Sequence, residues 1–256
     1  MTTHVLTPEL FHQQIHSDID KPVKDFRIKR NATRKRYLRK TSRAHSAPWA
    51  KATVNLTKKT IQAQVYLNFK QNKLSDSDYR KLTTLARNGI SRYWSQQIYI
   101  GEHKFSVKVQ ALHCNANSMI PVDLHIEADP DKYARSMNPA FMGVDARFIY
   151  NKGFFPNSDM ADNDFKLVAA HEFGHSVLMR AGGIPLSWGH KGSTNSITQS
   201  VKPSTPGYPK NGPIDLMKYY DWDKSRIQFH RRISDTTAME IDVKRLIWAA
   251  RIKWTP

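Results

Sequence analysis

Two histidines and a glutamate stand at a spacing that suits metal-assisted hydrolysis. Residues 171–175 read His-Glu-Phe-Gly-His, so His171 and His175 are four positions apart and Glu172 follows the first. Residues four apart lie on one face of a helix, so both imidazoles can bind a single zinc ion. Glu172 lies one position round the helix and can reach a water molecule on the metal without binding the metal itself. The segment predicts His171 and His175 as metal ligands and Glu172 as general base.

The flanking residues predict the helix that this motif requires. Apolar side chains surround the histidines from Leu167 to Leu178, which is typical of an amphipathic helix over residues 162–180. Asp162 or Asn163 can cap its start, and Gly182-Gly183 can end it.

A catalytic zinc usually has three protein ligands and an open position, so two histidines do not complete the site. Side chains that could supply the third ligand follow the helix in the sequence. They are His190, Asp215, Asp221, Asp223, His230 and Glu240.

The wider chain predicts an α+β fold that positions the motif. Apolar and polar residues alternate over 61–69, 104–112, 122–126 and 143–150, which indicates four strands. Ser75 and Asp78 form a capping box before a helical pattern that extends to Gln97. Residues 183–213 are rich in Gly, Pro, Ser and Thr and are expected to be loop, and a final helix is expected over 237–251. The order β-α-β-β-β-α fits a sheet packed against two helices.

This order and the segment Ile214-Asp215-Leu216-Met217-Lys218-Tyr219-Tyr220 together resemble the metzincin clan of zinc peptidases. The resemblance implies a zincin fold, in which a twisted, mostly parallel mixed sheet packs on helices that include the HExxH helix. A small loop-rich C-terminal subdomain with a Met-turn and a last helix then follows. It also implies one catalytic Zn²⁺, Met217 in the Met-turn beneath the metal, and Tyr219 as a residue that stabilises the oxyanion. In the clan, the strand comparable to residues 143–150 is the edge that pairs with extended substrate.

The chain departs from the long metzincin motif, which places Gly three and His six residues after the second His. Those positions hold Leu178 and Ala181. If the fold is metzincin-like, the helix extends by about one turn and the loop 182–189 returns His190 to the metal as third ligand. Asp215 and Glu240 remain alternatives at this point.

A second resemblance is more local. Trp188-Gly-His-Lys-Gly-Ser193, followed by the Met217 segment, looks like metallopeptidase toxin domains of bacterial type VI secretion spike proteins. This resemblance implies an antibacterial or host-directed effector, a secretion-spike carrier and a cognate immunity protein. It implies delivery by a specialised secretion system into the periplasm or cytoplasm of a target cell, which fits an N-terminus without a usual signal peptide.

Composition bounds the remaining possibilities. The net charge is +18, and residues 26–43 hold nine Lys or Arg and no acid. We therefore expect a basic, flexible or docking leader over 1–50 and a catalytic domain over 51–256, divided at 182/183 into two subdomains. No zinc-finger or RNA-binding spacing accompanies the basic residues, so specific nucleic-acid recognition is not expected. No apolar stretch reaches the length of a membrane span, and the single cysteine, Cys114, excludes an internal disulfide.

Three functions fit these patterns. The first is a zinc metalloendopeptidase that acts on proteins or peptides. The alternatives are a zinc amidase that acts on peptidoglycan stem peptides, and a basic binding module with a structural zinc. The sequence carries no signal for cleavage specificity, target compartment or oligomeric state.

Overall fold

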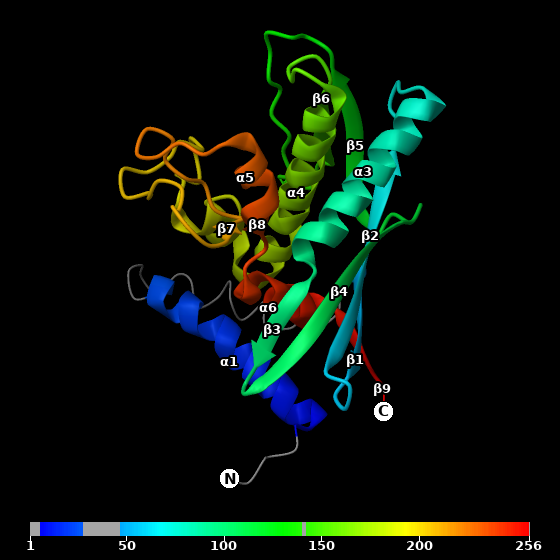
Figure 1. The fold of residues 1–256 in the computed structure, drawn as a ribbon. Helices are drawn as coiled ribbons and strands as arrows, with labels where there is room; N and C mark the ends of the chain where they lie inside the picture. The colour runs from blue at the N-terminus through cyan, green and yellow to red at the C-terminus, as the bar shows by residue number, and fades with distance from the viewer. Residues whose placement is uncertain (1–5, 28–46, 140–141, 256) are drawn as a thin grey trace.

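A mixed seven-stranded sheet packs with one face against the helices (Figure 1). The computed structural model describes residues 6–27, 47–139 and 142–255, so most of the basic segment 26–43 lies outside the described residues. The strands follow the order β3-β4-β2-β1-β9, and β5 and β6 continue the sheet from β2. Their bounds are β1 Ala50–Asn55, β2 Thr60–Lys70, β3 Gln96–Ile100, β4 His103–His113, β5 Ile120–Glu127, β6 Ala146–Asn151 and β9 Arg251–Thr255.

The long strand β2 organises this sheet. Its alternate residues, from Ile61 to Phe69, are buried, as the period-two pattern predicts. One edge pairs parallel with β4, while the other pairs antiparallel with β1 over its first half and parallel with β5 at its end. β6 pairs parallel with β5. The strands predicted within 61–69, 104–112 and 122–126 are confirmed, and that predicted at 143–150 begins at Ala146.

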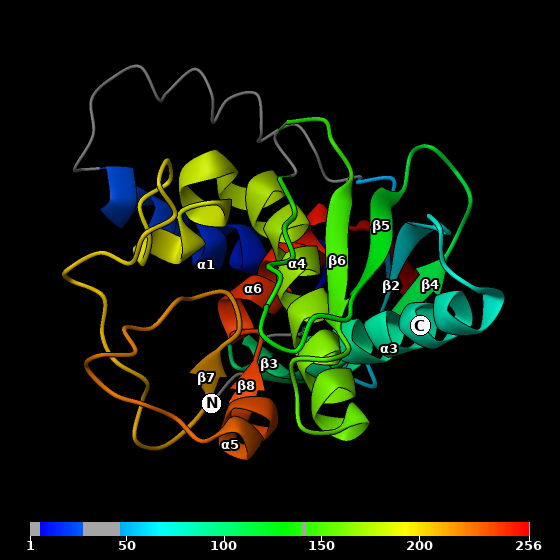
Figure 2. The ribbon, with the colours of Figure 1, turned by 90° about the horizontal axis from the view of Figure 1, so that it is seen from above.

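Two long helices, α3 (Asp76–Trp94) and α4 (Ser158–Ser187), pack against one face of the sheet (Figures 1 and 2). They approach closely at Gly89, where an added Cβ would overlap the backbone of Lys166. The Trp94 indole also donates to the carbonyl of Ala170 at 3.1 Å. The Ser75 cap of α3 is confirmed, because the Asp78 N–H donates to the Ser75 hydroxyl oxygen. These contacts fix α4, which carries the HExxH motif.

α4 is longer than the predicted helix 162–180. It begins after Asn157, whose side chain accepts from the Met160 N–H, and it continues to Ser187. Gly183 interrupts the helix with φ 70°, a left-handed conformation that glycine adopts without strain. The predicted stop is therefore a kink, and another turn of helix follows it. Among the residues described here, no helix is both long and apolar enough to cross a membrane.

The C-terminal part contributes side chains to the same core as the preceding helices and strands. α6 (Glu240–Ala249) packs on α4, and β9 pairs parallel with β1. Between α4 and α6 lie the short 3-10 helix η2 (His190–Gly192), the two-residue strands β7 (Ile214–Asp215) and β8 (Thr236–Thr237), and α5 (Phe229–Asp235). The irregular chain between them lies on the side of α4 away from the sheet (Figure 2).

The N-terminal segment also differs from the expected leader. Residues Pro8–Arg27 form α1, and its side chains Phe11, Ile15 and Ile19 are buried in the common core. The Phe11 ring contacts those of Phe105 and Trp254, with centroids 5.5 and 5.3 Å apart. Apolar packing thus joins at least the first three turns of α1 to the domain.

Candidate metal centre and its pocket

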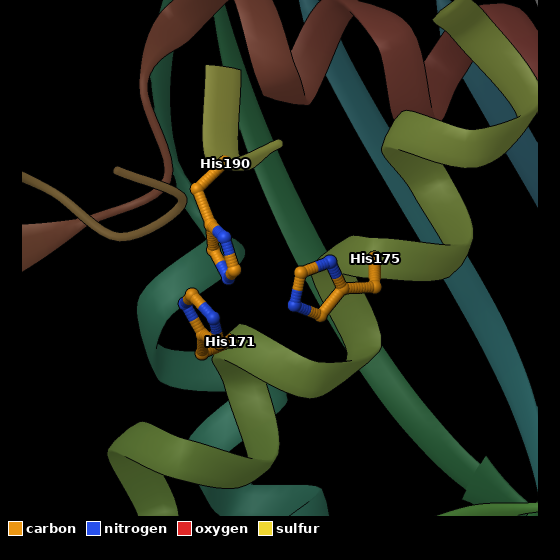
Figure 3. Close-up of side chains that lie close together, drawn as sticks. All are labelled: His171, His175 and His190. Carbon is orange, nitrogen blue, oxygen red and sulfur yellow. The ribbon is translucent and has the colours of Figure 1, made fainter. Parts of the chain in front are cut away.

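Three histidines from two elements converge on one point. His171 and His175 project from α4, and His190 projects from η2 toward the same space (Figure 3). Nitrogen atoms of the three rings all lie within 4.8 Å of one another. The structure therefore brings the sequence-predicted third ligand to the two motif histidines.

Hydrogen bonds orient two of these rings. His171 Nδ1 lies 2.6 Å from the carbonyl oxygen of Leu216, which only accepts, so Nδ1 carries the proton. His190 Nδ1 lies 2.9 Å from the hydroxyl of Thr194, which is placed to donate to the Trp188 carbonyl and so to accept from the ring. Both Nε2 atoms are left with a lone pair that can bind a cation.

The third ring is held in the same way. His175 Nδ1 lies 3.3 Å from the hydroxyl of Ser187, and that hydroxyl donates to the His175 carbonyl at 2.9 Å. The Ser187 oxygen therefore accepts from Nδ1, and Nε2 again has the free lone pair. Ser187 belongs to the helical turn beyond Gly183, so the extension of α4 supplies this contact.

The chemistry of this cluster fits a bound metal ion. The Nε2 atoms of His171 and His190 are buried and have no hydrogen-bond partner among the described residues. Burial lowers the pKa of His171 to about 4, and burial also holds the pKa values of His175 and His190 well below the ordinary value. The rings are therefore neutral near pH 7. Since buried polar atoms rarely stay unpaired, three neutral nitrogens facing one space suit a cation.

Glu172 lies beside this space without joining the imidazoles as a fourth ligand in the cluster. Its carboxylate is buried, and Oε2 lies 3.9 Å from His175 Nε2 with no hydrogen-bond partner in the described chain. Burial raises the pKa of Glu172 to about 8, although the charge of Arg135 acts in the opposite direction. A buried carboxyl group with a raised pKa can both take up and release a proton.

The Met217 turn lies against the motif helix. The Met217 N–H donates to Asp215 Oδ1 at 2.9 Å, and the neighbouring Leu216 carbonyl accepts from His171. Met217 is fully buried, and a methyl group at Gly174 would overlap its sulfur. Glycine between the two motif histidines is therefore what allows the methionine to pack beneath them.

The two alternative third ligands are engaged elsewhere. Asp215 forms a short ion pair with Lys191, which also bonds Asp242. Glu240 pairs with Lys244 at 2.7 Å, and its side chain is 41% exposed. Neither carboxylate belongs to the histidine cluster.

Tyr219 lies against two rings of the cluster, those of His171 and His190. Its ring stacks on that of His190, with centroids 3.9 Å apart, and its N–H donates to the Ser193 hydroxyl at 2.9 Å. The phenol oxygen accepts from Arg135 Nη2 at 2.7 Å. Burial raises the pKa of Tyr219, so its hydroxyl is neutral at pH 7 and can donate.

Residues 134–138, rather than β6, form the outermost segment at the β6 edge of the sheet. Met137 exchanges two backbone hydrogen bonds with Arg147 of β6, at 2.9 and 2.8 Å, and Ser136 Oγ accepts from the Ile149 N–H. Residues 134–138 thus cover the edge of β6, which corrects the expectation that residues 143–150 are the free edge. The Asn138 amide ties this segment to α4 by donating to the Glu172 carbonyl at 2.6 Å.

A pocket of about 450 Å³ opens beside the histidines. His171, Glu172 and Tyr219 are among its lining residues, so a molecule in the pocket would lie next to the candidate centre. Arg135, Lys218 and Arg232 also line it. The pocket therefore joins the candidate centre to the space around the molecule.

Sequence reasoning missed Arg135, Asn138, Ser187 and Thr194. Arg135 and Asn138 reach the centre only because Met137 pairs with Arg147, and this contact has no local sequence pattern. Ser187 lies three residues before His190, and Thr194 lies four residues after it. Hydroxyl residues this close to a candidate ligand are a sequence signal for side chains that orient the imidazole rings.

Comparison of this chain with protein-family models, with curated proteins and with solved structures finds no match.

Proposed function

We propose that this protein is a zinc metallopeptidase of metzincin type that hydrolyses peptide bonds. The observation that carries the proposal is the set of three neutral imidazoles around one point, with the buried Glu172 carboxyl beside it. Three protein ligands and an open side are typical of catalytic zinc, whereas a structural zinc is closed by four. The arrangement therefore favours catalysis over a binding module with a structural ion.

Each side chain of the site is suited to a separate role in the proposed reaction. The Nε2 atoms of His171, His175 and His190 would hold a zinc ion, which would supply Lewis acidity at this point. Glu172 would take a proton from a water molecule in this space and pass it to the leaving amine, because its buried carboxylate lies beside the three imidazoles and has no other hydrogen-bond partner among the described residues. The Tyr219 hydroxyl donates a hydrogen bond to the scissile carbonyl oxygen as negative charge develops on it. Arg135 keeps that hydroxyl in place.

The rim of the sheet favours a peptide as substrate. Because Met137 directs its N–H and carbonyl toward Arg147, alternation directs those of Ser136 and Asn138 away from β6. An extended peptide can add to such a rim through main-chain hydrogen bonds, with modest demands on sequence. We place the substrate chain along residues 134–138, next to Glu172.

The arrangement of elements supports the zincin part of the proposal. A mixed sheet packs on α3 and α4, the motif lies on α4, and the Met217 turn lies beneath it. The proposal of a toxin effector, with a secretion carrier and an immunity protein, rests on the resemblance of residues 188–193 and 214–220 alone.

The decisive experiment compares the wild type with Glu172→Ala on a denatured protein and a peptide library, with zinc and with a chelator. We expect zinc-dependent cleavage by the wild type and a loss of about 10²–10⁴-fold in Glu172→Ala. The variant should keep one zinc per chain and its melting temperature. Glu102→Ala, at an exposed carboxylate, is the matched control and should keep full activity.

Two results would contradict the proposal. One is equal cleavage by the wild type and Glu172→Ala. The other is an absence of peptide cleavage by the zinc-loaded wild type. Release of stem peptides from peptidoglycan in that second case would identify the amidase instead.

A further inference from the structure

The pocket beside Glu172 holds more positive charge than its own carboxylates balance. Arg135, Lys218 and Arg232 line it together with Asp215 and Glu172. If Glu172 serves as general base, its carboxylate is not available as a counter-ion for the cations that line the pocket.

Two of these charges are neutralised within the protein. Arg232 pairs with Asp164 at 2.8 Å, and the Asp164 carboxylate also accepts from the Tyr133 hydroxyl at 2.9 Å. Asp215 pairs with Lys191 behind the pocket wall. These pairs are structural, and their net effect on a ligand is small because each charge has a close opposite.

Two cations in the pocket, Arg135 and Lys218, have no carboxylate partner among the described residues. Arg135 donates to the Tyr219 hydroxyl and, at 3.5 Å, to Gln199, but forms no ion pair with any carboxylate in the described ranges. Lys218 likewise has no ion pair within those ranges, although it lines the same pocket. A guanidinium and an ammonium without counter-ions at one pocket attract an anion.

The remaining wall suits a short acidic side chain. Tyr133, Tyr208 and Tyr220 line the pocket, and the rings of Tyr208 and Tyr220 stack with centroids 4.8 Å apart. Tyrosine rings pack against methylene groups, and the hydroxyls of Tyr208 and Tyr220 can donate to a carboxylate, whereas that of Tyr133 already donates to Asp164. The net charge of +18 also draws acidic proteins toward the molecule as a whole.

We infer that this pocket binds the carboxylate of a substrate residue that flanks the scissile bond, so that the enzyme prefers Asp or Glu at that position. Arg135 and Lys218 are the specificity-determining residues. The inference rests on the proposed peptidase function and names the substrate class of the same site.

The test uses fluorogenic peptides that are identical except for the residues on either side of the cleaved bond. Each position carries Glu, Gln or Lys in turn. We expect kcat/KM for Glu to exceed that for Gln by about tenfold or more at one of the two positions, because hydrogen bonds between charged groups are stronger than those to a neutral amide. Lys should be the poorest residue there.

Matched variants assign the preference to the pocket. Lys218→Glu should abolish the preference for Glu over Gln and improve cleavage of the Lys peptide. Lys108→Glu makes the same change in net charge on an exposed position of β4, so it should leave the preference unchanged. Arg135→Gln should lower the ratio of kcat/KM for the Glu peptide to kcat/KM for the Gln peptide. A general loss of rate caused through Tyr219 would affect both peptides equally and would leave this ratio unchanged.

A binding measurement separates this inference from the proposed function. Zinc-loaded Glu172→Ala should bind the Glu peptide at least about tenfold more tightly than the Gln peptide in a fluorescence anisotropy titration. If the wild type cleaves no peptide, the peptidase proposal fails while this titration still decides the pocket's preference. Equal binding of the two peptides, or equal cleavage where cleavage occurs, overturns the inference.

Discussion

At the scale of single residues, the centre depends on where each ring proton lies. The three Nδ1 atoms bond Leu216, Ser187 and Thr194, which belong to the Met217 turn, the end of α4 and the loop after η2. The same tautomer is therefore imposed on all three ligands by three separate pieces of chain. Such oxygen partners raise ligand basicity and fix ring orientation, so they influence metal affinity.

Tyr219→Phe tests the role of the phenol. The variant keeps the ring that stacks on His190 and removes only the hydroxyl that Arg135 holds. We expect kcat to fall by about 10²-fold with zinc content and KM nearly unchanged, because one hydrogen-bond donor to the developing charge is lost. Steady-state kinetics with a metal assay check this, and Tyr99→Phe at an exposed tyrosine of β3 is the control. An unchanged kcat would remove Tyr219 from the mechanism.

The residue types at the centre were predictable, whereas their supports were not. His171, Glu172 and His175 follow from helical spacing, which is local, and His190 followed from the need for a third ligand. Arg135 approaches the centre through a backbone pairing between Met137 and Arg147 that only the folded sheet creates. No spacing in the sequence encodes that contact.

At the scale of elements, a buried network of charges joins the third ligand to the last helix. Lys191, next to His190, bonds both Asp215 of β7 and Asp242 of α6, and Asp242 also bonds Arg245 at 2.7 Å. Asp242 and Arg245 are almost fully buried. The network fixes η2, the Met217 turn and α6 relative to one another.

Asp242→Asn tests this coupling. Lys191 and Arg245 would lose their shared carboxylate inside the protein, so we expect the free energy of unfolding to fall by about 3–5 kcal/mol. Zinc should also dissociate faster, because the loop that carries His190 is less constrained. Urea denaturation and transfer of zinc to a chromogenic chelator measure the two effects. Asp235→Asn, which removes a partly exposed ion pair with Arg231, should change neither, and equal zinc release in both variants would contradict the coupling.

The strands show which elements a sequence reveals. β2 and β4 alternate clearly because one face of each is buried in the core. β9 reads Arg-Ile-Lys-Trp-Thr with no fully buried residue, and its place follows from its pairing with β1 at the end of α6. The hydrophobic pattern therefore predicts the central strands. It does not predict strands such as β9, which are held mainly by backbone pairing.

At the scale of the whole molecule, one core extends from the first helix to the last strand. Phe11 of α1 contacts Phe105 of β4 and Trp254 of β9, so chain segments near both termini meet at one place. The net charge of the N-terminal region suggested a solvated leader. The four-residue spacing of Phe11, Ile15 and Ile19 was the signal that part of it folds onto the domain.

Phe11→Ala tests whether α1 belongs to the domain. Removing a fully buried aromatic side chain leaves a cavity, so we expect the free energy of unfolding to fall by about 3–5 kcal/mol in a single transition. Leu10→Ala, next to it but 44% exposed, should have a much smaller effect. Thermal and urea denaturation followed by circular dichroism measure both, and indistinguishable stabilities would mean that the helix contributes nothing to the fold.

The helical turn between Gly183 and Ser187 also determines how distant relatives can be recognised. The third histidine follows the second by fifteen positions, 175 to 190, and the hydroxyls that orient the rings stand twelve and nineteen positions after His175. A search profile with a fixed short gap between second and third ligand therefore discards chains built in this way. A profile that allows a variable insertion, and requires a hydroxyl residue before the third histidine and another after it, retains them.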